Sequence, residues 1–538
     1  MTAVAPARAT RRRPARAPGA RAPAWLLVPG ALVALLALLP IAYLATLAVT
    51  ADESALALAV RERTIGVLGR TILLAGTVTI ASALLAVPIA WLTVRSDLPW
   101  RRFWTIATVL PLVIPSYVGG YAFVAAFGPR GALQSFLEPL GVMRLPEIYG
   151  FGGAVLTLTL FSFPYVVLSV RGALIRLDPA FDDVAHSLGR GPWRSFISIT
   201  LPQLRPAIAA GSLLVALYAL SDFGAVSLLQ FDSFTRAIYL QYRASFDRTL
   251  AAVLALMLVG LTALLLLGEA RIRGRARYHR SGGGASRPAR PVTLGAWRLP
   301  ALAFLSATVG LAVLVPVATI GYWLIRGLAA GEPLNLVLDA AANSILASGL
   351  TALVAVAASL PVAILAVRHR GPLGAFVERT TYAGFALPGI VIGLALVFFA
   401  ANYLPWIYQT LPLLVVAYLV RFVPQAVGAT RASLLQVSPR LEEVARTLGR
   451  SPRAVLRDVT LPIIRPGLVA GAALVFLTAM KELPTTILLA PTGFDTLAVR
   501  IWSATSEGFF ARAAAPALLM VIVATLSLAV LLRQEEIR

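Results

Sequence analysis

The sequence predicts an all-α polytopic membrane protein, built as two parallel repeats of six spans each. Hydrophobic residues make up 59% of its 538 residues and charged residues only 13%, far from the usual balance of a soluble domain. Apolar runs recur, each able to cross a hydrocarbon layer of about 30 Å with about 20 helical residues. They are continuous rather than alternating, which favours helices over a barrel. One polar segment also occurs twice, 260 residues apart without a gap, which indicates duplication.

Six spans are predicted in each half of the chain. In the first half the apolar runs cover residues 25–48, 66–94, 103–127, 152–175, 206–229 and 249–269. In the second half they cover residues 299–325, 341–367, 378–401, 411–430, 466–490 and 510–532. Kinks are predicted at glycine and proline residues inside these runs, namely Pro111, Pro115, Gly119, Gly120, Pro388, Gly389 and Gly393.

Arginine placement predicts the orientation of the spans. The N-terminal segment 1–24 and the segment 270–298 between the halves are both rich in arginine, and cytoplasmic segments carry an excess of such residues. We therefore expect both segments, and the C-terminal tail 533–538, to be cytoplasmic. The formal net charge of +23 is then explained by topology and by attraction to anionic membrane lipid, without a nucleic-acid partner.

The two halves also align outside the polar segment, but at a different offset. Pro88 and Arg95 precede Pro361 and Arg368 by 273 residues, so the first half carries thirteen extra residues, which fit in the loop 128–150. Since each repeat has six spans, both have the same orientation in the membrane. The expected organisation is a first repeat 25–269 with the polar segment 178–206, a flexible linker 270–298, and a second repeat 299–532 with the polar segment 438–466.

Each polar segment predicts a short helix, a glycine turn and a second short helix. Asp178-Pro179 and Ser438-Pro439 each place a capping side chain before a proline at the first helical position. Acidic residues follow in the first turn, where the helix dipole favours negative charge. The residues expected to close the first helix in a left-handed conformation are Gly189 and Gly449, and those expected to end the second helix are Pro202 and Pro462.

The repeated segment resembles the cytoplasmic coupling motif of ABC importer permeases. The shared pattern is an acidic residue, an alanine, a glycine and then Ile/Val-x-Leu-Pro at fixed spacing. The resemblance implies a type I ABC importer permease fold, in which each coupling helix seats in a cleft of an ATPase subunit. It assigns coupling to Asp183, Ala185, Gly189, Leu201 and Pro202 in the first copy and to Glu443, Ala445, Gly449, Leu461 and Pro462 in the second. The first copy departs from the family pattern at Asp183 and Val184, so weaker or differently angled docking is expected there.

The chain is not expected to be an enzyme. It contains no cysteine, which excludes disulfides and thiolate chemistry, and it has no histidine–cysteine metal set. Lys481 is its only lysine, and Met480 precedes it where a phosphate-binding loop needs glycine. No cofactor is therefore expected on this chain, and the resemblance places ATP–Mg on a separate ATPase.

Charged residues inside the spans are the candidates for a translocation pathway, because charges in lipid are costly and usually face a cavity or a partner. Asp222 in the fifth span aligns with Glu482 in the eleventh at the 260-residue offset, and Lys481 precedes Glu482. The two carboxylates could line one central pathway, where hard oxygen ligands suit a cation such as ferric iron. Alternatively, Lys481 and Glu482 form an ion pair and Asp222 is a hydrogen-bonded packing residue. The residues leave both interpretations open and establish no metal site.

A second resemblance concerns the cargo. The stretch Met480–Ala498, together with Ser506-Glu-Gly508 and Ala515-Pro-Ala517, is similar to the C-terminal part of fused ferric-iron ABC permeases. It implies ferric-iron import across a bacterial inner membrane, with a periplasmic or lipid-anchored binding protein, an ATPase homodimer and one copy of this chain. Permeases for thiamine, polyamines, phosphonate or an oxyanion such as sulfate share the architecture or the coupling motif, so these cargoes stay open.

Two other classes of membrane protein stay open as well. A secondary transporter also has two six-helix halves, but it needs ion-coupling carboxylates in its core and no docking loops. A membrane scaffold or sensor would transport nothing. The resemblance instead implies alternating access, in which ATP closes the ATPase dimer and the coupling helices transmit that motion to the spans.

Overall fold

The computed structural model describes residues 23–129, 131–142, 145–178, 189, 191–244, 249–273, 291–333, 335–369 and 371–536. Within these ranges ten helices are long and apolar enough to cross a membrane. Two further pairs of helices, each bent at a short break, bring the number to twelve if each pair counts as one span. The predicted all-α polytopic fold is thereby confirmed.

Each half supplies five of the long spans. In the first half they are α1 (Ala24–Val49), α3 (Glu62–Arg95), α7 (Phe151–Arg176), α10 (Leu201–Ser221) and α13 (Thr249–Arg273). In the second half they are α14 (Arg298–Val309) continued by α15 (Val315–Ala329), α16 (Asn335–Arg368), α19 (Leu411–Gln436), α22 (Leu461–Met480) and α25 (Phe510–Glu536). The same order of elements in both halves reflects the duplication seen in the sequence.

The third span of each half is sharply broken. In the first half α4 (Arg101–Ala107) and η1 (Leu110–Val113) precede α5 (Ser116–Phe127), and in the second half α17 (Pro372–Ala386) precedes α18 (Gly389–Tyr403). The two parts meet at 94° and 105° respectively. The first break falls at Ile114-Pro115 and the second at Leu387-Pro388. Both are explained by the proline, because it lacks a backbone N–H and disfavours the helical conformation of the residue before it. The predicted kinks at these prolines are confirmed.

The fifth span of each half ends earlier than the apolar runs 206–229 and 466–490 predict. Helix α10 ends at Ser221 and α22 ends at Met480, and each is followed by a turn and a short helix. These short helices are α11 (Gly224–Leu228) and α23 (Pro484–Leu489). Hydropathy missed the breaks because the sequence stays apolar on both sides of the polar turn residues.

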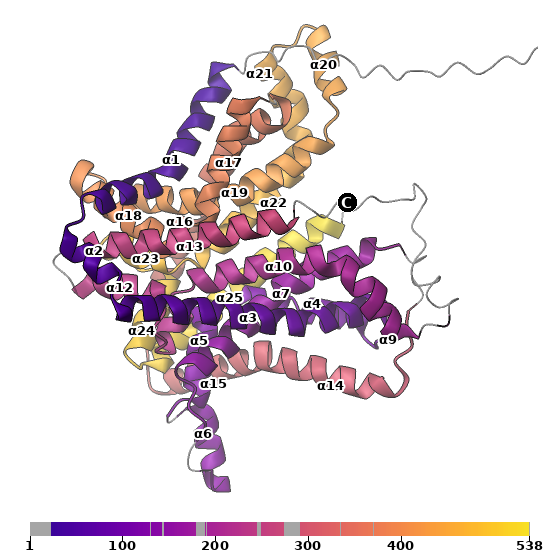
Figure 1. The fold of residues 1–538 in the computed structure, drawn as a ribbon, viewed down its shortest axis with the longest axis vertical. Helices are drawn as coiled ribbons and strands as arrows, with labels where there is room; N and C mark the ends of the chain where they lie inside the picture. Colours follow the sequence, from indigo (N-terminus) through magenta and orange to yellow (C-terminus); the bar gives the residue numbers. More distant parts are fainter. Residues whose placement is uncertain are drawn as a thin grey trace, which may run out of the picture.

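The first span of each half packs against the other half. Helix α1 contacts α16, α17 and α18, whereas α15 contacts α5 in addition to α25 of its own half. Figure 1 shows α1 beside the orange helices of the second half, and α14 and α15 below the purple helices of the first. The predicted repeats 25–269 and 299–532 are therefore repeats of sequence that interlock, rather than two separate bodies.

The end of the expected linker 270–298 is anchored to the first half. The backbone N–H of Val292 donates to the carbonyl of Arg95 at 2.7 Å, and the carbonyl of Val292 accepts from the N–H of Asp97 at 3.0 Å. The Asp97 carboxylate in turn accepts from the N–H of Leu294 at 2.9 Å and from Arg298 at 3.0 Å. The hydrogen bond from the Leu294 N–H holds the pKa of Asp97 below its usual range. The expectation of a flexible linker is thus wrong for residues 291–298, and residues 274–290 lie outside the described residues.

The thirteen extra residues of the first half lie in the predicted loop. Helices α6 (Ala132–Leu137) and η2 (Glu138–Leu140) are inserted between α5 and α7, whereas a short turn joins α18 to α19 in the second half. Figure 1 shows α6 projecting from the body of the molecule. This insertion breaks the symmetry of the two halves on the side opposite the polar segments.

Candidate functional site

The polar segment of the second half folds as the predicted hairpin. Helix α20 (Pro439–Thr447) is followed by Gly449 at φ +82°, and then by α21 (Pro452–Val455). The N–H of Arg450 donates to the carbonyl of Ala445 at 3.1 Å, which closes the end of α20 around the left-handed glycine. In the first half Gly189 has φ +73°, the same left-handed conformation, while Asp183 and Ala185 lie outside the described residues.

The capping side chain of this hairpin differs from the prediction. Ser438 precedes α20, but its side chain makes no capping hydrogen bond, and the N–H of Leu441 donates to the Ser438 carbonyl at 3.1 Å. The hydroxyl of Ser451 instead accepts from the N–H of Ala454 at 3.3 Å and caps α21. Capping by a side chain therefore occurs at the second helix of the hairpin.

Pro202 and Pro462 do not end the second helix of each hairpin, so that prediction is wrong. Helix α9 (Pro192–Ser195) continues through the π-helical turn η3 (Phe196–Thr200) into α10, and α21 continues through η6 (Leu456–Thr460) into α22. The prolines are the second residues of α10 and α22. A π-turn interrupts the regular hydrogen-bond ladder where proline lacks its N–H, so the helix can continue. The second helix of each polar segment is thus joined without a break to a span.

A buried acidic residue fixes α20 to the spans, and it is Glu442 rather than its neighbour Glu443. The Glu442 Oε1 accepts from Nε of Arg368 at 3.2 Å, from Nη2 of Arg368 at 3.0 Å and from the Thr460 hydroxyl at 3.2 Å. Arg368 also donates to the carbonyl of Val437 at 3.0 Å, the residue directly after α19. Glu443 is exposed. Sequence reasoning used Arg368 only as a marker of alignment and topology, and it missed this contact.

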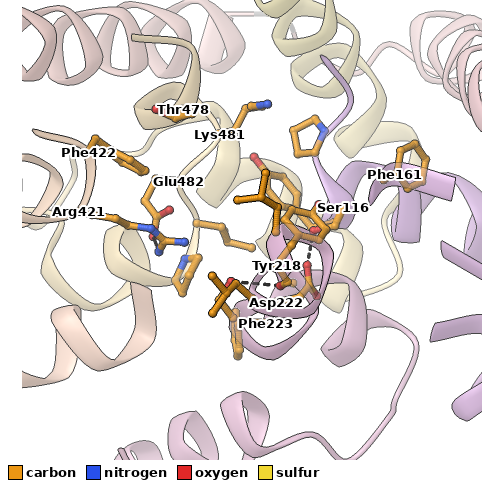
Figure 2. Close-up of a pocket in the computed structure, with 18 of the residues that line it drawn as sticks. Ser116, Phe161, Tyr218, Asp222, Phe223, Arg421, Phe422, Thr478, Lys481 and Glu482 are labelled. Carbon is orange, nitrogen blue, oxygen red and sulfur yellow. Dashed lines mark hydrogen bonds and ion pairs between the residues drawn. The ribbon is translucent and has the colours of Figure 1, made fainter. Parts of the chain in front are cut away.

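A central cavity of about 220 Å³ lies between the two halves. Its walls come from the breaks in the third and fifth spans and from α7 and α19, as Figure 2 shows. The lining residues include seven pairs that stand 260 residues apart, namely Phe161 and Arg421, Tyr165 and Gln425, Tyr218 and Thr478, Ser221 and Lys481, Asp222 and Glu482, Phe223 and Leu483, and Gly224 and Pro484. The two repeats therefore contribute equivalent positions to one chamber, but with different side chains.

Asp222 is a helix cap on the wall of this cavity. Its Oδ1 accepts from the N–H groups of Ala225 and Val226 at 3.1 and 3.2 Å, at the start of α11. Its Oδ2 accepts from the hydroxyl of Ser116, the first residue of α5. The side chain is buried, with an exposed fraction of 8%. Asp222 therefore joins the two broken spans of the first half to each other.

Glu482 has the equivalent position in the second half, with an added counter-charge. Its Oε1 accepts from the N–H and the hydroxyl of Thr485 at 3.2 and 2.6 Å, and from Nη1 of Arg421 at 2.7 Å. The ammonium of Lys481 instead donates to the carbonyl of Leu112 in the first half, at 2.9 Å. The geometry is that of packed, hydrogen-bonded carboxylates, and the partner of Glu482 is Arg421 rather than Lys481. Sequence reasoning missed Arg421, although a charge inside the predicted span 411–430 marks it.

Gly389 explains how the second half makes room for this ion pair. It stands 273 residues after Ser116, at the start of α18. A Cβ at Gly389 would lie 1.6 Å from Nη1 of Arg421 and 2.4 Å from Oε1 of Glu482. The first half has a serine hydroxyl and Phe161 at the equivalent positions, whereas the second half has no side chain and an arginine. The helix break is therefore the same in both halves, but different side chains stabilise it on the two sides of the cavity.

The cavity is bordered by charged and polar side chains from both halves. Among the described residues, no three histidine, cysteine, aspartate or glutamate side chains gather closely enough to hold a metal ion. The cavity walls present hydroxyl, amide, guanidinium and ammonium groups together with the two engaged carboxylates. Asp222, Lys481 and Glu482 all border this chamber, as the pathway hypothesis requires.

Comparison with known proteins identifies the two halves as copies of one family domain. The chain matches the model of the family described as binding-protein-dependent transport system inner membrane component, over residues 82–278 and again over 355–534. Both matched regions include the hairpin and the fifth span. The duplication found in the sequence is therefore a duplication of this domain.

Individual relatives match over different shares of the chain. It is 36% identical to the Fe(3+)-transport system permease protein FbpB 2 of Haemophilus influenzae, over 93% of this chain and 96% of that protein. It is 24% identical to the ferric transport system permease protein FbpB of Actinobacillus pleuropneumoniae, over 85% of this chain and 69% of that protein. The molybdenum transport system permease protein ModB of Escherichia coli is 36% identical over 25% of this chain and 58% of its own length.

Proposed function

Because the chain belongs to the family of binding-protein-dependent transport system inner membrane components, we propose that it forms the membrane pathway of an ATP-driven ABC importer of ferric iron. It is a multi-pass transport subunit, and the family implies a substrate-binding protein and an ATPase as partners. ATP hydrolysis is then the work of the separate ATPase, which holds ATP–Mg, and this chain contributes the pathway and its coupling elements.

The observation that carries the proposal is an uncovered apolar face on α20. Leu441, Val444 and Leu448 are exposed by 50%, 57% and 78% and lie on one side of the helix, at spacings of three and four residues. An apolar stripe on a polar hairpin is the kind of face that a protein groove covers. The adjacent left-handed Gly449 has open space around its Cα, so a partner backbone can approach it closely. A cleft on the ATPase fits this surface.

The fold connects that surface to the cavity through continuous helices. Helix α22 begins at the hairpin and ends at Met480, directly before Lys481 and Glu482, so about 30 Å of helix joins the two sites. Helix α19 carries Arg421 in the cavity wall and ends at the start of the hairpin. A movement of the hairpin therefore moves two walls of the chamber at once. This is the mechanical basis of the alternating access that we propose.

The two hairpins support the proposed assembly. Figure 1 shows α20 and α21 at the top of the molecule and α9 at the lower right, so the two regions are well separated, as two docking points for an ATPase homodimer require. One copy of this chain then suffices for one transporter, since it carries both halves. A binding protein docks on the opposite side, where α6, α12 (Phe234–Ala244) and α24 (Leu497–Ser506) lie. Arginine-rich segments favour cytoplasmic N- and C-termini.

Ferric iron is the cargo that the relatives favour. The relative matching 93% of this chain is a ferric permease, whereas the molybdenum permease matches only a quarter of it. An oxyanion is accordingly the second candidate cargo. Uptake of thiamine, a polyamine or phosphonate would be recognised in the same experiment. A secondary transporter fits less well, because it has no use for the hairpins with their exposed apolar face.

Uptake in cells tests this function. Cells that express the chain with its ATPase and binding protein should accumulate labelled ferric iron, but not labelled molybdate or thiamine. Accumulation should stop when ATP is depleted and survive collapse of the proton gradient. Uptake that depends on the proton gradient alone would indicate a secondary transporter, and uptake of molybdate without iron would assign an oxyanion instead.

A further inference from the structure

The charges around the central cavity are not equally neutralised. Asp222 is held by Ser116 and by two backbone N–H groups, and Glu482 is paired with Arg421 at 2.7 Å. Three of the four charged groups that border the chamber are therefore compensated by charge or by a full set of hydrogen bonds. The fourth is the ammonium of Lys481.

Lys481 faces the chamber with a neutral partner only. Its ammonium donates to the carbonyl of Leu112, across the boundary between the halves, at 2.9 Å. No carboxylate of the described residues lies within ion-pair distance of it, since Glu482 is turned to Arg421. An ammonium has three donors, so one hydrogen bond leaves two for another partner. An uncompensated charge inside a membrane is costly, which makes it a marker of function.

The identity of this residue adds to the argument. The chain has 47 basic residues, and all but Lys481 are arginines. An arginine would place a larger, planar guanidinium group there, whereas lysine places a compact ammonium at the end of a flexible alkyl chain. Ser221, the equivalent residue of the first half, is neutral, so the charge stands on one side of the chamber only.

Several polar side chains that line the cavity are also hydrogen-bond donors. Tyr165 and Tyr218 present hydroxyls on one side. The carbonyl of the Gln425 amide accepts from the Thr478 hydroxyl at 3.0 Å, which leaves the amide NH₂ as the group for a ligand. Asp222 is engaged through both carboxylate oxygens and Glu482 through Oε1, so the chamber offers hydrogen-bond donors and one ammonium without an ion pair. This set matches negatively charged oxygen atoms better than a bare cation.

We propose that Lys481 is a specificity-determining residue that binds negatively charged oxygen atoms of the cargo in the central cavity. Resting on the proposed function, this means that ferric iron passes the chamber as an anionic complex with oxygen ligands, and not as the free ion. A hard trivalent cation prefers such ligands, and its own charge would be repelled by the ammonium. The Leu112 carbonyl holds the ammonium in place while the chamber is empty.

Variants of Lys481 test the charge. In the assembled transporter in proteoliposomes, Lys481→Gln keeps a donor for the Leu112 carbonyl but removes the charge, and should lower the initial rate of labelled-iron uptake about tenfold or more. Lys481→Arg should retain more uptake than Lys481→Gln. Moving the ammonium across the chamber, in Lys481→Ser with Ser221→Lys, should restore a part of the uptake that Lys481→Ser loses. Arg326→Gln, which removes an arginine of α15 outside the chamber, is the matched control and should behave as wild type.

Double-label uptake tests the ligand. Iron is offered with carbon-labelled citrate, or with phosphorus-labelled phosphate, each as the sole oxyanion in a bicarbonate-free buffer. The proposal predicts that one of the labelled anions enters with the iron. Entry of an anion without iron would also support the role of Lys481, but would replace iron by an oxyanion in the proposed function. Entry of iron with neither label, or wild-type uptake by Lys481→Gln, would overturn the proposal while leaving ATP-driven iron uptake intact.

Discussion

The guanidinium of Arg368 lies 3.0 Å from the carboxylate of Glu442, and the pair joins the end of α16 to the hairpin helix α20. Both side chains are largely buried. Arg368 also donates to Val437, directly after α19, and Glu442 also accepts from Thr460, directly before α22, so one ion pair connects α16, α19, α20 and α22. The hairpin is thereby tied to three spans, and its motion cannot be taken up by the connecting turns alone.

We predict that Glu442→Gln uncouples ATP hydrolysis from transport. Removing one partner of a buried pair leaves an uncompensated charge, at a cost of about 3–5 kcal/mol. Uptake per ATP hydrolysed should fall about tenfold, within the range of measured coupling energies, while the ATPase still co-purifies. The exchange Arg368→Glu with Glu442→Arg should recover part of the coupling. Asp458→Asn, which weakens two exposed ion pairs, with Arg450 and Arg457, is the control and should change little. Unchanged uptake per ATP in Glu442→Gln would refute the role of the pair.

We predict that Gly449→Arg abolishes docking of the ATPase while leaving the permease inserted in the membrane. Gly449 has φ +82°, a conformation that costs other residues about 1–2 kcal/mol, and a long side chain would also fill the space needed by a partner. Gly449→Asn should be milder, because asparagine tolerates this conformation. Co-purification of the ATPase with the two variants measures the effect. Equal docking of wild type and Gly449→Arg would argue against the hairpin as the coupling site.

We predict that residues of the first half can replace their counterparts in the second half only when all three positions are changed together. Gly389→Ser alone should displace Arg421 from Glu482 and lower the stability of the purified permease by about 3 kcal/mol. Gly389→Ser combined with Arg421→Phe and Glu482→Asp copies Ser116, Phe161 and Asp222, and should regain most of that loss. Thermal unfolding in detergent measures this coupling. Purely additive effects would show that the three residues do not act together.

We predict that the anchor of residues 291–298 weakens in acid. The N–H of Leu294 and the charge of Arg298 hold the pKa of Asp97 below its ordinary value, so the ionised carboxylate favours the anchored state. That contribution is present above the ordinary pKa of about 4 and is lost as the pH falls below it. Limited proteolysis at residues 291–298 should therefore rise with acidification in wild type. In Asp97→Asn, cleavage should be higher at neutral pH and should change less with acidification. A wild-type profile that is flat with pH would contradict the assigned anchor.

The sequence was informative wherever the structure is decided locally. The twelve apolar runs, the breaks at Pro115 and Pro388, and the left-handed turn at Gly449 depend on residues close in the chain, and hydropathy, proline and glycine report them directly. The prolines at 202 and 462 misled this reasoning, because a π-turn just before each of them lets the helix continue.

The parts that could not be predicted depend on contacts between distant residues. Glu482 and its partner Arg421 are 61 residues apart in the sequence, and Lys481 and Leu112 are 369 residues apart. No pattern of neighbouring residues in the sequence predicts that α1 packs on the other half, or that Val292 is hydrogen-bonded to Arg95. Alignment of the two repeats does place Asp222 opposite Glu482, but it cannot show that both carboxylates are already engaged.

The most direct test of the account is iron accumulation in proteoliposomes that contain this chain, its ATPase and the iron-loaded binding protein. We predict accumulation of labelled ferric iron only when ATP is supplied on the side of the hairpins, and its loss in Gly449→Arg without loss of the chain from the membrane. Accumulation without ATP, or full accumulation by Gly449→Arg, would contradict the claim that the hairpins drive transport.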